Sequence, residues 1–126
     1  MFSGEQYGKA EEAIGHYCSI FENARVIYLD HYRPGDNEPE GSVRRAEFEI
    51  GGQRVKAIDS AMEHAFSFTP AISLWVECSS EAELERTASA LGGGGSILMP
   101  LDNYGFSRKF CWVADRYGVT WQLNLR

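Results

Sequence analysis

The order of predicted elements repeats in the two halves of the sequence. Its hydrophobic periodicity predicts helices over 8–21 and 80–91, and each helix is followed by strands, over 25–32, 42–50 and 53–59 and over 96–100, 107–114 and 118–125. A strand expected over 71–78 precedes the second helix, and residues 1–3 are the stub of its counterpart. The repeat therefore predicts an α+β fold of two βαβββ halves, in which the first strand is shortened.

The two halves, residues 1–60 and 70–126, are expected to form one domain of 126 residues. Two such units can place their sheets side by side, curl them around one cleft, and cover the outer faces with helices. The fold class is therefore a curled mixed sheet around a cleft.

The last strand alternates strictly between apolar and polar side chains. Trp121, Leu123 and Leu125 point one way and are expected to lie buried under helix 80–91, whereas Gln122 points the other way, into the cleft. A polar sheet face near aromatic side chains is typical of a ligand site. An ordinary antiparallel sheet with one solvated face gives the same pattern, so both interpretations stay open.

The candidate cleft residues combine flat aromatic walls with hydroxyl, amide and ammonium groups. The two glycine-containing hairpins superpose at Gly52 and Gly118, which makes Lys56 the counterpart of Gln122. The predicted ligand-binding residues are Lys56, Ser73, Trp75, Tyr104, Phe106, Trp112, Thr120, Gln122 and Asn124.

Composition argues against several classes of partner. The net charge is −6, and no basic cluster is longer than Arg44-Arg45, so nucleic acid is not expected as a partner. No apolar run approaches the roughly 18 residues of a membrane helix, and no signal peptide is present. Cys18, Cys78 and Cys111 are odd in number and widely spaced, which predicts reduced thiols in a cytoplasmic protein.

The glycine run Gly92–Gly95 follows a helix and precedes a strand. A phosphate-binding loop has the opposite order, because it follows a strand and opens a helix. No glycine-rich strand-to-helix turn for S-adenosylmethionine is present either. No cofactor is therefore predicted.

Several motifs make the chain resemble a known superfamily. They are Ala10-Glu11-Glu12-Ala13-Ile14, Tyr17 with Ser19-Ile20-Phe21, the run 68–74, the run 98–107, and Trp112-Val113 continuing through Asp115-Arg116-Tyr117-Gly118-Val119 to Trp121-Gln122-Leu123-Asn124. With these motifs the chain resembles the vicinal oxygen chelate superfamily of glyoxalase I, extradiol dioxygenases and fosfomycin-resistance proteins. It is most similar to the PhnB-like branch, labelled 3-demethylubiquinone-9 3-methyltransferase domain. The resemblance covers nearly the whole chain, except for several residues of the first strand.

The resemblance implies four positions at which the superfamily's enzymes hold a divalent metal. Three of them fall at Ala71, Gln122 and Lys56, and the fourth falls at or before Met1. Alanine has no donor atom, and a protonated lysine repels a metal ion. No metal is therefore predicted.

Three functions stay open. The first is metal-independent binding of a small polar or anionic organic molecule in the cleft. The second is an enzyme, either one of the glyoxalase and dioxygenase superfamily acting on a small organic substrate or the labelled methyltransferase; its catalytic residues are unknown, with Lys56 or Cys111 as reactive candidates. The third is a scaffold without a ligand. A homodimer is expected, because the shortened first strand leaves a sheet edge exposed.

Overall fold

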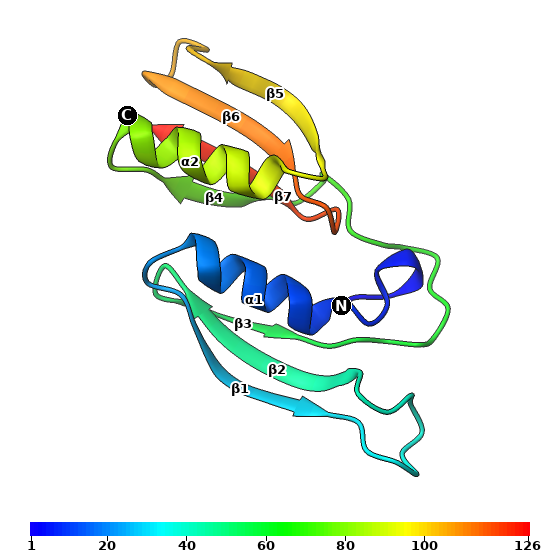
Figure 1. Ribbon diagram of the computed structural model, residues 1–126. Coiled ribbons are helices and arrows are strands. Elements are labelled where there is room, and N and C mark those ends of the chain that lie inside the picture. The colour runs from blue at the N-terminus through cyan, green and yellow to red at the C-terminus, as the bar shows by residue number, and fades with distance from the viewer. The chain divides into compact units, whose positions relative to one another are not determined.

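The computed structural model describes residues 1–126 in two compact units, Met1–Ser67 and Phe68–Arg126 (Figure 1). In each unit one helix covers one face of a sheet. Neither helix is long and apolar enough to cross a membrane.

The first unit contains a three-stranded antiparallel sheet of order β1-β2-β3. Its elements are the short 3₁₀ helix Gly4–Gln6, α1 (Ala10–Ile20), β1 (Arg25–His31), β2 (Val43–Ile50) and β3 (Gln53–Ala57). The expected stub of an additional strand is present as one parallel bridge between Phe2 and Asp59. The amide of Phe2 donates to the carbonyl of Ile58 at 2.8 Å, and the amide of Ser60 donates back to Phe2 at 2.9 Å.

A buried carboxylate ties this unit together. Oδ1 of Asp59 accepts from the amides of Gly8 at 3.0 Å and Ala10 at 3.1 Å, and Oδ2 accepts from the amide of Val43 at 2.8 Å. Ala10 is the first residue of α1, where the helix N–H groups have no partner inside the helix, and Gly8 lies two residues before it. Asp59, which follows the end of β3, thus caps the start of α1 and also fixes the start of β2.

The second unit contains a four-stranded sheet of order β4-β7-β6-β5. Its elements are β4 (Leu74–Glu77), α2 (Glu81–Gly92), β5 (Ser96–Asp102), β6 (Lys109–Ala114) and β7 (Thr120–Leu125). Strand β4 runs parallel to β7, and the other pairs are antiparallel. Ser80 caps the start of α2, because its hydroxyl accepts from the amide of Glu83 at 3.1 Å.

The core of the second unit confirms the alternation in the last strand. Trp121, Leu123 and Leu125 are at most 4% exposed, and β7 packs on α2. Gln122 is half-buried and lies on the face of the sheet away from α2. The turn before β7 is held by Asp115, whose Oδ1 accepts from the amides of Tyr117 at 2.9 Å and Val119 at 3.0 Å.

Two expectations for this sheet are wrong in detail. The strand expected over 71–78 begins only at Leu74, and Ile72 is 80% exposed. Pro70 has no amide hydrogen for a sheet ladder, and the Ile72 carbonyl accepts instead from the Thr120 hydroxyl at 2.9 Å. One interpretation of the last strand was a solvated polar face, but Thr120 and Asn124 on that face are buried.

Candidate ligand-binding face

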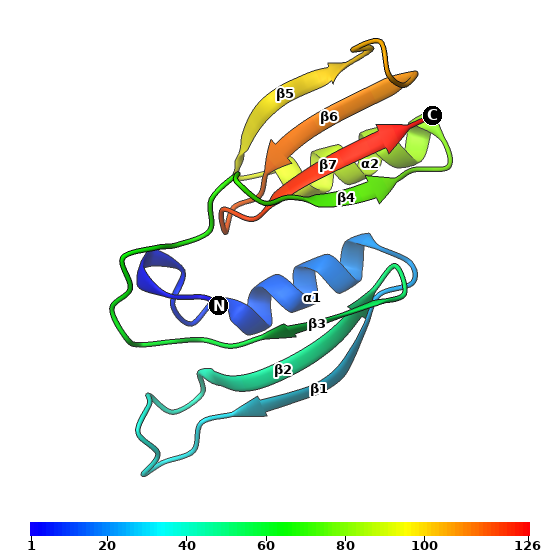
Figure 2. The same cartoon turned by 180° about the vertical axis from the view of Figure 1, so that it is seen from behind.

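The candidate site is the face of the second unit's sheet that points away from α2, which we call the open face. Figure 2 shows the unit from this side, with α2 behind the sheet. The strand register places side chains of β4, β7 and β6 in rows across this face. Eight of the nine predicted site residues belong to the second unit, and Lys56 belongs to the first.

The central row joins two indoles and an amide. Trp75 on β4 lies opposite Gln122 on β7, and Gln122 lies opposite Trp112 on β6. The Nε1 atom of Trp112 is buried and has no hydrogen-bond partner. A buried polar group without a partner is costly, so this indole N–H is a donor in need of an acceptor.

At one end of the face, the polar side chains already form hydrogen bonds within the protein. The hydroxyls of Ser73 and Thr120 lie 2.8 Å apart, and Thr120 donates to the Ile72 carbonyl. Because a hydroxyl carries a single hydrogen, Ser73 is the donor to Thr120. This pair fixes the start of β4 against β7 and leaves an acceptor site on Ser73.

The row at the other end contains a carboxylate that the sequence analysis missed. Glu77 accepts from Nδ2 of Asn124 and from Nε1 of Trp75, both at 2.9 Å. These two hydrogen bonds hold the pKa of Glu77 below its usual value of 4.5, and the bond from Asn124 has the larger effect. The signal in the sequence was its spacing of two from Trp75, which puts both on one strand face. Oδ1 of Asn124, a residue 4% exposed, is buried without a partner.

Four rings form an aromatic cluster beside this row, namely Trp75, Tyr104, Phe106 and Phe110. Phe110 is buried, and the other three ring centroids lie 5.0–5.8 Å from its own. Tyr104 is held by its hydroxyl, which donates to the Pro100 carbonyl at 2.6 Å. Trp75, Tyr104 and Phe106 remain exposed, so the cluster presents aromatic surface to a ligand. The sequence analysis did not assign Phe110 to the site.

Lys56 lies on the face of β3 away from α1, because its neighbour Ala57 is buried on the helix side. Acidic and basic side chains on the strands of this sheet form three ion pairs, Arg25–Glu49 at 3.5 Å, Arg45–Asp30 at 3.5 Å and Arg54–Glu47 at 3.4 Å. Lys56 takes part in none of them and is exposed. Its ammonium group is therefore available to an anion.

The residues at the superfamily's metal positions do not fit a divalent metal. Ala71 offers no donor and is exposed, and Gln122 offers a single amide oxygen between two indoles. No group of three or more His, Cys, Asp or Glu residues is gathered in the structure.

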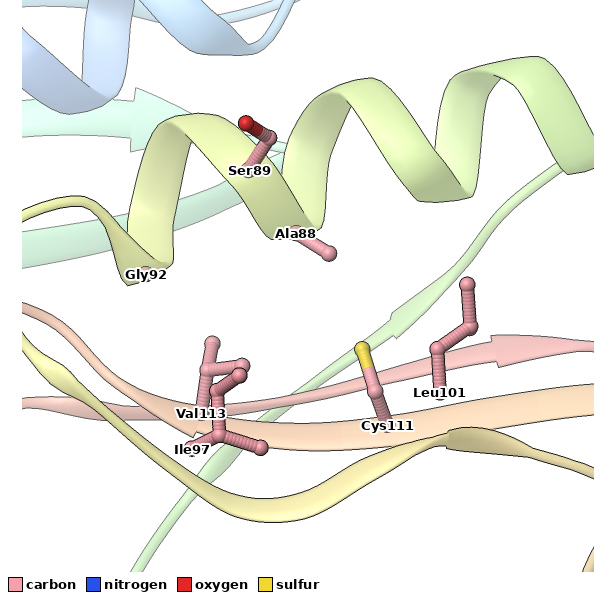
Figure 3. Close-up of a pocket in the computed structure, with 7 residues that line it drawn as sticks. All are labelled: Ala88, Ser89, Gly92, Ile97, Leu101, Cys111 and Val113. Atoms are coloured by element: carbon pink, nitrogen blue, oxygen red, sulfur yellow. The ribbon is translucent and has the colours of Figure 1, made fainter.

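Cys111 does not belong to the open face, so it is not the reactive group of that site. Its side chain points toward α2 (Figure 3) and is 2% exposed. Burial raises the pKa of its thiol, which keeps it protonated and weakly nucleophilic at neutral pH. These observations argue against Cys111 as a reactive group.

The fold defines the class of protein. The structure is similar to that of a fosfomycin resistance protein from Mesorhizobium loti, with a TM-score of 0.62, 17% identity, and coverage of 94% of this chain and 83% of that one. At this identity the similarity shows the fold alone, which is the vicinal oxygen chelate fold that the resemblance implied.

The family follows from the sequence match. A family model described as 3-demethylubiquinone-9 3-methyltransferase matches residues 1–124, and the chain belongs to this PhnB-like family. A putative 3-demethylubiquinone-9 3-methyltransferase, PhnB protein, from Bacillus cereus is 44% identical, with a TM-score of 0.91 and coverage of 95% of this chain and 93% of that one. A protein from Pseudomonas aeruginosa is 25% identical, with a TM-score of 0.81 and coverage of 95% and 91%. No curated protein matches the sequence.

We expect the hydrogen bonds of Glu77 to make stability depend on pH. Because the folded-state pKa is lowered, their contribution is present above the unfolded value of 4.5 and is lost as pH falls through the folded value. In Glu77→Gln, the free energy of unfolding should therefore fall less steeply below pH 4.5 than in the wild type. Urea denaturation at a series of pH values measures this. Glu40→Gln, a change at an exposed residue outside these contacts, should follow the wild-type curve.

Proposed function

We propose that the open face of the second unit binds a small polar or anionic organic molecule without a metal. The observation that carries the proposal is the row of Trp75, Gln122 and Trp112, with a buried indole N–H that has no partner. Two indoles supply flat apolar walls, and the amide supplies both a donor and an acceptor. A few polar groups among aromatic side chains are the usual composition of a small-molecule site.

The first unit offers a separate candidate for binding an anion, Lys56. The superfamily's metal would attract carboxylates and oxyanions, and an ammonium at one of its ligand positions attracts the same groups. Lys56 forms no ion pair with the carboxylates of its own sheet, which supports this role. Lys56 is thus proposed as an anion-binding group of the first unit, and the two indoles as the flat walls of the site on the second unit.

A screen of aromatic carboxylates and their matched neutral amides tests both parts, with binding followed by ligand-observed NMR at low salt. Trp112→Phe keeps a ring and removes the N–H, so it should weaken both classes by about tenfold. Lys56→Met should weaken the carboxylates by about threefold to tenfold and leave the amides unchanged, because only the charge is lost.

The control for charge is Lys9→Met, which removes an exposed lysine whose ion pair with Glu12 spans 3.9 Å at the start of α1. It should leave carboxylate binding unchanged. Equal affinities of wild type and Trp112→Phe for every hit would contradict the site, and an unchanged carboxylate affinity in Lys56→Met would contradict the charge preference. A stoichiometric equivalent of bound metal in the purified protein would contradict metal-independent binding.

We further propose a cytoplasmic homodimer. In the second unit, β4 pairs along the length of β7. In the first unit, the corresponding residues form only a single bridge, between Phe2 and Asp59. Strand β3 therefore keeps a free edge within its unit. Free edges invite a partner strand, and two-fold dimers are the commonest symmetric assembly. The three free thiols suit a reducing compartment. Light scattering should give about twice 14.1 kDa, and a mass of 14.1 kDa at high micromolar concentration would overturn the dimer.

A further inference from the structure

We propose that a second, separate pocket, between α2 and strands β5 and β6, binds a small planar apolar molecule of the size of indole. This pocket lies on the helix side of the sheet, opposite the open face, and the proposal does not depend on the function proposed above. Its volume is about 220 Å³. The lining residues are Ala88, Ser89, Gly92, Ile97, Leu101, Cys111 and Val113.

The pocket arises because the end of α2 has small residues where β5 has large ones. Ala88 and Gly92 lie one turn apart on α2, so they share a helix face. Helix α2 packs on β6 and β7. On β5, Ile97 remains 67% exposed although it is a large apolar residue. A gap is thus left between the helix and β5, as Figure 3 shows.

The chemistry of the lining favours an apolar occupant over water. Ala88, Val113 and Ile97 point into the gap, whereas Ser89 turns its hydroxyl away from it (Figure 3). A stably held water needs two to four polar partners, which this lining does not offer. Displacing poorly held water by an apolar group is favourable.

The shape and the sulfur atom favour a flat ring. The gap lies between one helix and a sheet, and its helix side is lined by the small residues Ala88, Ser89 and Gly92. The thiol of Cys111 points into the gap, where sulfur makes favourable contacts with an aromatic ring. An aromatic ring would therefore contact both the helix side and the sheet side of the pocket.

Indole itself is the probe, titrated against the full chain and followed by protein NMR shifts and by the melting temperature. Ala88→Leu fills the gap with a residue that favours helix, so it should weaken indole binding at least about tenfold while the melting temperature is kept or raised. Ala82→Leu makes the same change at an exposed position of α2 and should leave the affinity within about twofold. Trp112→Phe, on the open face, should also leave indole binding unchanged, which separates this pocket from the other site.

Gly92→Ala provides a second variant in case Ala88→Leu does not fold. A Cβ at Gly92 would lie 3.9 Å from Cγ1 of Val113, an ordinary contact, so the variant is expected to fold. It takes up part of the same space and should weaken indole binding about threefold. The proposal is overturned if indole gives no saturable shift with the wild type, or if its affinity is unchanged in folded Ala88→Leu or, failing that, in Gly92→Ala.

Discussion

Asp59→Ala is expected to lower the free energy of unfolding by about 4 kcal/mol, because it leaves buried backbone amides without an acceptor. The carboxylate is 2% exposed and accepts from Gly8, Ala10 and Val43. Each amide that loses its partner out of reach of water costs about 1–3 kcal/mol. The start of α1 also loses a negative charge that favours the helix dipole.

Far-UV circular dichroism during urea denaturation measures the effect of Asp59→Ala on the first unit. The control is Asp36→Ala, since Asp36 also accepts from a backbone amide, that of Arg33 at 2.7 Å, but is exposed. Water replaces that acceptor, so the control should change stability by less than about 1 kcal/mol. A similar small change in both variants would show that Asp59 does not hold the unit together.

Asp115→Ala is expected to lower the free energy of unfolding by about 3 kcal/mol, through the turn that leads into β7. Its Oδ1 atom holds the amides of Tyr117 and Val119, and Oδ2 accepts from Nε1 of Trp121 at 3.0 Å. Trp121 is 1% exposed, so its N–H would be left in the core without water.

Tryptophan fluorescence follows this variant directly, because all three tryptophans lie in the second unit. Asp102→Ala is the control, since Asp102 accepts from the amide of Asn103 at 2.7 Å on the exposed part of β5. It should change stability by less than about 1 kcal/mol. A loss in Asp115→Ala no larger than in this control would mean that the buried hydrogen bonds of Asp115 contribute little.

The sequence by itself determined the elements and the faces they bury. Strict alternation assigned Trp121, Leu123 and Leu125 to the core, and all three are buried. The physical reason is that these periods follow from local backbone geometry, so a few consecutive residues are enough to show them. The repeat and the motifs extended this to the fold and the family.

The tertiary structure alone decided which distant residues meet. Asp59 caps a helix that begins 49 residues earlier, and Asn124 reaches Glu77 across 47 residues of chain. The parallel register of β4 on β7 puts Trp75 beside Gln122, and the small residues of α2 opposite β5 leave a pocket. Such pairings depend on strand order, register and packing volume, which no local pattern encodes, because the same alternation suits several registers.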